Sequence, residues 1–279
     1  MGLAGFFRIT RPANSVIAGL AAIVAYLIAT GTLVNGVLLL MAVVILITAA
    51  GNVINDYFDA EIDAINRPER PIPSGAMSRN AALVWAGILF ILGLAACMFT
   101  TPLCLGIALF NALLLVVYAA RLKSTPLLGN IAVAYLSASI FLFGGAFAGW
   151  HLLVQVLPIA VITFLAMLAR ELLKDAEDIE GDRAGGADTL PIRIGVQKTA
   201  LLAFICAAAA VTASVFPYSW WGVWYLPGIA LVDVIIIGAA VKALGSTDPG
   251  SLKVTGSTTL LKIGMFASLV VFTLSAVLL

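Results

Sequence analysis

The sequence has very little charge. Asp, Glu, Lys and Arg make up only 10% of its 279 residues, whereas 62% of the residues are hydrophobic. A soluble domain has about 25% charged residues. The net charge is +1 and no run of basic residues occurs, so we expect no nucleic acid partner. The composition excludes a soluble globular domain and predicts an integral membrane protein that lies in a lipid bilayer.

Histidine and cysteine are also scarce. The single histidine, His151, lies between two apolar runs beside Trp150, and we expect it at the membrane interface rather than in catalysis. The three cysteines, Cys97, Cys104 and Cys206, lie inside apolar runs. They have no metal-ligand spacing, and we expect them to be small buried side chains.

Long apolar runs, in contrast, fill most of the chain. Because a helix needs about 20 apolar residues to cross a bilayer, nine segments qualify, at roughly 13–30, 34–58, 80–99, 103–121, 127–148, 152–177, 197–216, 223–243 and 257–278. All 15 Lys and Arg residues fall on one side of this arrangement. That side is expected to be cytoplasmic. We therefore predict an all-α membrane protein with nine transmembrane helices, its N-terminus in the cytoplasm and its C-terminus outside.

The acidic residues gather at the ends of two apolar runs. The first stretch, 52–78, reads NVINDYFDAEIDAINRPERPIPSGAMS, and its Asn55, Asp59 and Asp63 are spaced four apart. On a helix that spacing places the side chains in one column. Such carboxylates repel one another unless a cation lies among them, and oxygen ligands with phosphate oxygens suit Mg²⁺. The alternative is a polar helix end that extends into water.

A second column lies far downstream. In RELLKDAEDIEGD, Lys174, Asp178 and Asp182 are again four apart, and Asp175 lies one step beside them. We expect the two columns to face each other across one cavity, where bridging metal ions would hold a diphosphate. Outside these regions, Asp233 lies near the middle of an apolar run. A carboxylate there has a functional role, pairs with a polar neighbour or is protonated.

Basic residues flank the first column. The loop 66–75 reads NRPERPIPSG, and we expect its three prolines to fix an extended path. That path would hold Arg67 and Arg70 near the first column, where guanidinium groups suit phosphate oxygens. Ser78 is the expected N-cap of the next helix. The alternative makes both arginines simple anchors at the cytoplasmic face.

Three further residues are candidates for substrate binding. Tyr118 and Lys123 lie at another cytoplasmic edge, together with Arg121. Lys123 and Arg121 provide phosphate-binding charge, unless they serve only topology. Asn14 lies where the first segment enters the membrane, and we expect it to cap that helix or to line the cavity.

Two carboxylate columns, a set of cations and a helical bundle in lipid indicate a substrate with a diphosphate head and an apolar tail. Departure of diphosphate from an allylic carbon generates carbocation character, and an apolar cavity protects such a cation from water. The residues thus predict metal-dependent transfer from a lipid diphosphate. They leave the acceptor open.

The two motifs resemble the signatures of the UbiA superfamily of intramembrane prenyltransferases. The resemblance implies nine helices around a central cavity, in a single domain over 1–279 with cytoplasmic cap loops at about 59–79, 121–127 and 175–197. It also implies diphosphate bound through Mg²⁺ by Asn55, Asp59, Asp63, Asp178 and Asp182. The resemblance further implies that Arg67, Lys123 and Lys174 contact the diphosphate.

Within the superfamily, three phrases are most similar to an archaeal branch: ITRPANSVIAG, AGNVINDYFDAEIDAINRPERPIPSG and RELLKDAEDIEGDRAGGADTLPIRIG. The similarity implies transfer from geranylgeranyl diphosphate to the free hydroxyl of geranylgeranylglyceryl phosphate, which makes the second ether of archaeal membrane lipid, with no obligate protein partner. Asp63 or Asp182 is then the expected catalytic base. Arg8, Arg11 and Arg70 are candidates to bind the acceptor's phosphate.

Two other functions remain open at this point. One is the same chemistry on an aromatic acceptor, such as a quinone or haem precursor. The other is a transporter of lipid phosphates, which would more often show internal symmetry and helices broken near the membrane midplane. Here the charge gathers at one membrane face and no matching halves occur, which favours the enzyme.

Overall fold

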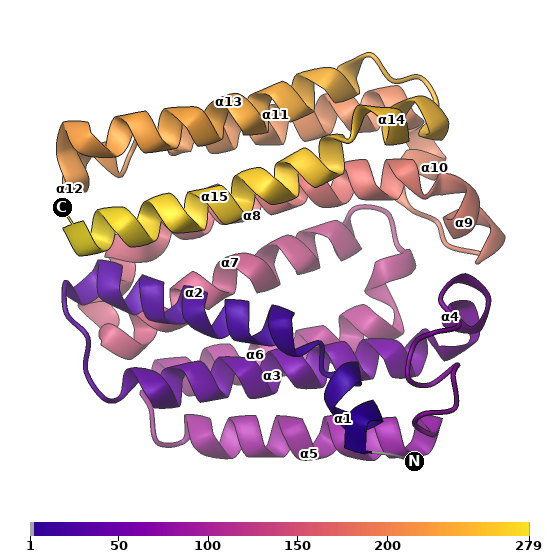
Figure 1. Ribbon diagram of the computed structural model, residues 1–279, viewed down its shortest axis with the longest axis horizontal. Helices are drawn as coiled ribbons and strands as arrows, with labels where there is room; N and C mark the ends of the chain where they lie inside the picture. Colours follow the sequence, from indigo (N-terminus) through magenta and orange to yellow (C-terminus); the bar gives the residue numbers. More distant parts are fainter. Residues whose placement is uncertain (1–2, 279) are drawn as a thin grey trace. The chain divides into compact units, whose positions relative to one another are not determined.

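The computed structural model describes residues 3–278, and over this range the chain is helical and contains no strand (Figure 1). It divides into two compact units. The first comprises the described residues up to Arg121 together with Leu142–Val154, and the second comprises Leu122–Phe141 and the described residues from Gln155 onward. Helix α7 therefore begins in the second unit and ends in the first.

The first unit is organised around helix α3. Its elements are α1 (Leu3–Ile9), α2 (Pro12–Thr30), α3 (Val37–Phe58), α4 (Ala60–Asn66), α5 (Arg79–Cys97), α6 (Pro102–Ala120), the end of α7 (Leu128–Ala148) and η2 (Trp150–Leu152). Helix α3 packs against α2, α5 and α6. Small side chains such as Ala49, Ala50 and Ala82 are buried where α3 meets α5. Close approach through small residues is typical of helices packed in a membrane.

The second unit contains a group of long helices and several short ones. Its elements are η1 (Leu122–Ser124), the start of α7, most of α8 (Leu153–Glu177), α9 (Ile179–Ala184), α10 (Leu190–Ile194), α11 (Val196–Ala213), α12 (Tyr218–Trp221), η3 (Gly222–Trp224), α13 (Tyr225–Leu244), α14 (Pro249–Thr255) and α15 (Ser257–Leu278). Helix α13 packs against both α11 and α15.

Eight stretches of the described chain are long and apolar enough to cross a membrane, so the protein is a multi-pass membrane protein. Nine segments were expected. The difference lies in Val196–Leu244, a single 49-residue stretch that contains both α11 and α13, joined through α12 and η3. Nine crossings and the orientation of the termini stay predictions.

The segment after α4 corrects one expectation. Residues 66–75 form successive turns rather than an extended path: the N–H of Arg70 donates to Arg67 O (3.0 Å), that of Ser74 to Arg70 O (2.9 Å) and that of Met77 to Pro71 O (2.9 Å). The φ angle that proline fixes suits the second position of a turn as well as extended chain. The N-cap is confirmed, because Ser78 accepts a hydrogen bond from the N–H of Ala81.

Candidate active site

The first acidic column lies where one helix gives way to another. Helix α3 ends at Phe58 and α4 begins at Ala60, so Asp59 occupies the junction. The N–H of Asp59 donates to Asn55 O at 2.9 Å, and the N–H of Asp63 donates to Asp59 O at 2.8 Å. The four-residue hydrogen-bonding pattern thus continues through the junction and keeps the three side chains in one column.

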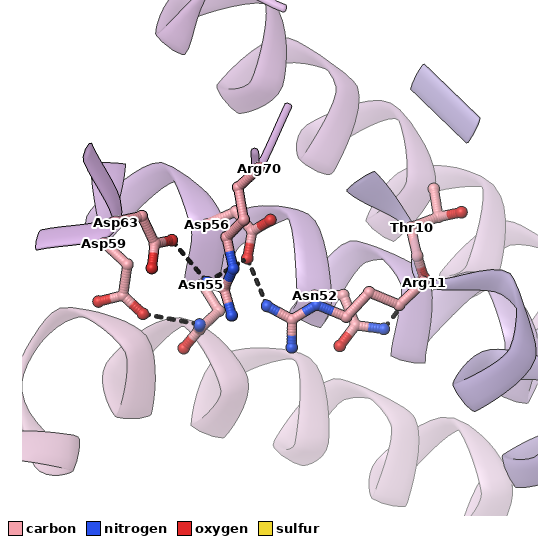
Figure 2. A network of polar contacts seen from close by, with 8 residues as sticks. All are labelled: Thr10, Arg11, Asn52, Asn55, Asp56, Asp59, Asp63 and Arg70. Atoms are coloured by element: carbon pink, nitrogen blue, oxygen red, sulfur yellow. Dashed lines mark hydrogen bonds and ion pairs between the residues drawn. The ribbon is translucent and has the colours of Figure 1, made fainter. Parts of the chain in front are cut away.

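Two side chains of this column, Asn55 and Asp59, contact each other (Figure 2). Asn55 Nδ2 donates to Asp59 Oδ2 at 2.8 Å. An amide that donates through its nitrogen still has an oxygen to offer a cation. The donor set is therefore oxygen only, which matches the ligand preference of Mg²⁺.

Asp63 is buried and carries an ion pair. Arg70 Nη1 lies 2.5 Å from Asp63 Oδ2 and 3.2 Å from Asp56 Oδ1. A second arginine, Arg11, reaches the same oxygen of Asp56 at 2.5 Å (Figure 2). The Asp56 side chain is only 4% exposed, and a charge so deeply buried must be paired to be tolerated.

Sequence reasoning missed Asp56. It follows Asn55 directly, so its side chain points about 100° away from the column around the helix. It lies four residues after Asn52, and these two polar residues share a face of a mostly apolar helix. An ionisable residue in such a helix is the signal that could have identified it.

The second column has the same construction. Helix α8 ends at Glu177 and α9 begins at Ile179, with Asp178 at the junction. The N–H of Asp178 donates to Lys174 O (3.1 Å) and that of Asp182 to Asp178 O (2.9 Å). The Thr189 hydroxyl donates to Asp182 Oδ2 at 3.2 Å. Burial raises the pKa of Asp182, and the hydrogen bond from Thr189 opposes this.

Polar residues of the second unit surround this column. Asn130 Nδ2, on α7, donates to Asp175 Oδ2 at 2.7 Å. The N–H of Asp188 donates to Ser124 O at 2.9 Å, which ties the segment after α9 to η1. Lys123 lies in η1, and burial lowers its pKa. An ammonium group in that position gains more than an exposed one from a phosphate partner, because water competes less.

Other sequence candidates lie apart from these contacts. The N–H of Arg67 caps α4 on Asp63 O at 2.8 Å, and its side chain is exposed. Asn14 is exposed in the first turn of α2, whose N-cap is Arg11, so its expected role as a helix cap is wrong. Tyr118 is half-buried in the last turn of α6. That the two columns face one cavity stays a prediction.

Within the described residues, no group of three or more His, Cys, Asp or Glu side chains is arranged to hold a metal. Such a cluster would indicate a site built by the protein alone. Mg²⁺ commonly uses only one or two carboxylates and completes its shell with water and substrate phosphates. The columns, with exposed Asp178 and the Asn55–Asp59 pair, fit that second arrangement.

Comparisons with known proteins agree on one family. The model of the UbiA prenyltransferase family matches residues 18–275. The chain is 79% identical to the digeranylgeranylglyceryl phosphate synthase of Methanoregula boonei over 99% of both chains. It is 57% identical to the enzyme of that name from Methanoculleus marisnigri, over 99% of this chain and 100% of the other.

Solved structures show the same fold. A structure of digeranylgeranylglyceryl phosphate synthase matches with a TM-score of 0.85 and 37% identity, over 99% of both chains. A UbiA homolog from Archaeoglobus fulgidus bound to GPP and Mg²⁺ matches with a TM-score of 0.65 and 17% identity, over 94% of this chain and 99% of that one. The second likeness is one of fold alone.

Proposed function

Because the chain belongs to the UbiA prenyltransferase family, we propose that it transfers a geranylgeranyl group from geranylgeranyl diphosphate to the free hydroxyl of geranylgeranylglyceryl phosphate. The product carries the second ether bond of archaeal membrane lipid. The observation that carries this proposal is the pair of acidic columns, each kept in register across a helix junction. The 79% identity to the digeranylgeranylglyceryl phosphate synthase of Methanoregula boonei, over 99% of both chains, supports it.

In this mechanism Asn55, Asp59, Asp63, Asp178 and Asp182 would hold Mg²⁺. The metal, when bound, would supply positive charge to neutralise the leaving diphosphate. Arg67, Lys123 and Lys174 contact the phosphate oxygens, and Tyr118 and Asn14 border the substrates. The apolar surroundings exclude water from the allylic cation.

The reaction requires a group on the protein that accepts the proton of the acceptor's hydroxyl. The C1–O bond of the donor breaks with its electron pair on diphosphate, and the acceptor oxygen bonds to C1 and gives up its proton. Of the two expected bases, Asp63 is held in an ion pair by Arg70 at 2.5 Å, whereas Asp182 Oδ2 accepts a hydrogen bond from the neutral Thr189 hydroxyl at 3.2 Å. Oδ1 of Asp182 is therefore the better place for that proton.

The caps that carry both columns lie on the side where the Lys and Arg residues gather. Positive charge is retained in the cytoplasm. We place the active site at the cytoplasmic face of a cell membrane, in one catalytic domain whose caps are formed by the segments around α4, η1 and α9–α10.

A direct transfer assay tests the proposal. Purified protein in detergent receives Mg²⁺ and geranylgeranyl diphosphate, with geranylgeranylglyceryl phosphate in one reaction and 4-hydroxybenzoate in another. We expect product only from the glycerol phosphate, and none after chelation by EDTA. Product from the aromatic acceptor alone would overturn the acceptor, and diphosphate binding without transfer to either would favour a transporter.

A further inference from the structure

Asp56 connects two arginines that come from different parts of the first unit. Arg11 lies between α1 and α2, and Arg70 lies in the turns after α4. Each donates to the same oxygen, Asp56 Oδ1, at 2.5 Å and 3.2 Å respectively (Figure 2). The carboxylate is buried whereas the Arg11 side chain is 32% exposed and that of Arg70 15%. The buried Asp56 carboxylate thus holds both arginine side chains in place.

The backbone at Arg11 is held in an unusual conformation to make this contact. Its φ of 49° and ψ of 63° are left-handed, which costs a non-glycine residue about 1–2 kcal/mol. Two hydrogen bonds fix the preceding residue: Asn52 Nδ2 and Ser15 Oγ both donate to Thr10 O at 3.0 Å. Two residues of helix α3 therefore hold this turn: Asn52 binds the Thr10 carbonyl, and Asp56 fixes the position of the Arg11 side chain.

A third guanidinium group lies near the same loop. Arg8, at the end of α1, donates from Nη2 to Glu69 O at 3.3 Å and is exposed. We call Arg8, Arg11 and Arg70 the arginine cluster. Its three positive charges exceed the two negative charges of Asp56 and Asp63. Each guanidinium has five N–H donors in a planar fork, so a contact through one nitrogen leaves donors that suit a phosphate.

The reaction brings two anionic head groups together, a diphosphate and a phosphate. Like charges this close repel each other, and nearby cations offset that repulsion. The acidic column would hold the diphosphate through Mg²⁺, whereas Asp56 Oδ1 accepts from both Arg11 and Arg70 (Figure 2). Arg70 touches both Asp56 and Asp63, so it lies where the two sites meet.

We propose that the arginine cluster binds the phosphate monoester of the acceptor, with Asp56 as a positioning residue. This proposal rests on the proposed function. The phosphate carries about −1.5 to −2 charges at neutral pH. Its binding to these guanidinium groups does not require a metal ion. The donor, in contrast, depends on metal for its site.

The first experiment compares two acceptors, geranylgeranylglyceryl phosphate and the same alcohol without phosphate. For Arg11→Gln we expect KM for the phosphorylated acceptor to rise about ten- to a hundredfold, the loss typical of a hydrogen bond to a charged group. KM for geranylgeranyl diphosphate should change less than about twofold, and the penalty should vanish with the alcohol. An equal penalty on both acceptors, or a raised KM for the donor, would overturn the proposal.

Arg79→Gln is the matched control. Arg79 belongs to the same unit but pairs with the exposed Glu61 and lies over the Tyr57 ring. Its loss should leave the preference for the phosphorylated acceptor unchanged. An effect as large as that of Arg11→Gln would indicate general attraction by surface charge and would overturn a specific site.

Binding without turnover gives a second readout. In EDTA and without donor, equilibrium dialysis should still detect geranylgeranylglyceryl phosphate bound to the wild type and about tenfold or more weakened binding to Arg11→Gln and Asp56→Asn. Asp56→Glu should restore part of it. Loss of acceptor binding on chelation would overturn the cluster. Should Asp56→Asn fail to fold, Arg11→Gln alone decides.

The two proposals fail in different ways. A wild-type protein that does not prenylate geranylgeranylglyceryl phosphate overturns the proposed function. A wild type that does so, with Arg11→Gln equally impaired on both acceptors, overturns only the role of the arginine cluster.

Discussion

Gly144 is the position where a single methyl group should do most damage to the fold. It lies on α7, and a Cβ there would be 2.4 Å from Ala22 O, 2.6 Å from Ala25 Cβ and 3.0 Å from Tyr26 N, all on α2. Ordinary contacts begin at 3.4 Å, so the shortfall at the carbonyl oxygen is 1.0 Å. Because that oxygen belongs to the backbone, it cannot rotate away and the two helices must separate.

The magnitude follows from two opposing effects. Overpacking costs about 1–3 kcal/mol, with a backbone clash at the upper end, and replacing glycine by alanine in a helix gains about 1 kcal/mol. We expect Gly144→Ala to lower the free energy of unfolding by about 2 kcal/mol, from these same two effects. Gly87→Ala in α5 is the control, since no atom lies within 4 Å of its Cβ position, and it should be neutral or stabilising.

The protein carries its own reporter for this measurement. Cys97 and Cys104 are buried in the same unit as Gly144, whereas the half-buried Cys206 lies in the other unit, so in a Cys206→Ala background a thiol-reactive dye in detergent reports when the first unit opens. We expect the Tm of Gly144→Ala to fall by about 4–8 °C for a loss of about 2 kcal/mol. A Tm equal to that of Gly87→Ala would refute the clash with α2 that we infer for a methyl group at Gly144.

Three further outcomes are expected. Asp59→Ala and Asp178→Ala should each lower kcat/KM for the donor more than about 100-fold in saturating Mg²⁺; near-normal activity would remove that residue from the metal site. Because burial lowers the pKa of Lys123, its charge is lost as the pH rises through that lowered value. A pH profile of kcat/KM should therefore decline on the alkaline side, and Lys123→Arg should move the decline upward; an unmoved decline would exclude Lys123. Ser78→Ala removes the cap of α5 and should cost about 1 kcal/mol in the same dye assay; an unchanged Tm would contradict this.

The sequence predicted those features that depend on short-range periodicity. Apolar runs of about 20 residues became helices, and the four-residue spacing of Asn55, Asp59 and Asp63 became a column because α-helical hydrogen bonds impose that repeat. Ser78 became a cap because its hydroxyl lies within reach of a free N–H three residues on.

Features that depend on distant contacts were not predicted. Arg11 and Asp56 are 45 residues apart, and no periodicity links them. The left-handed turn that joins them lacks the glycine that usually signals it. The path of 66–75 was predicted wrongly, because proline restricts φ and leaves ψ to be decided by neighbours such as Arg70, whose ion pairs favour the folded turns.

The junctions at Asp59 and Asp178 also limit how this chain can vary. Segments that connect membrane helices normally tolerate insertions and deletions. Here one added residue between Asn55 and Asp63 would rotate every following side chain by about 100°, and Asp63 would leave both its column and Arg70. The same holds between Lys174 and Asp182. Natural variants should therefore keep the length of these two nine-residue stretches fixed, while connections such as 31–36, at the opposite end of α3, vary in length.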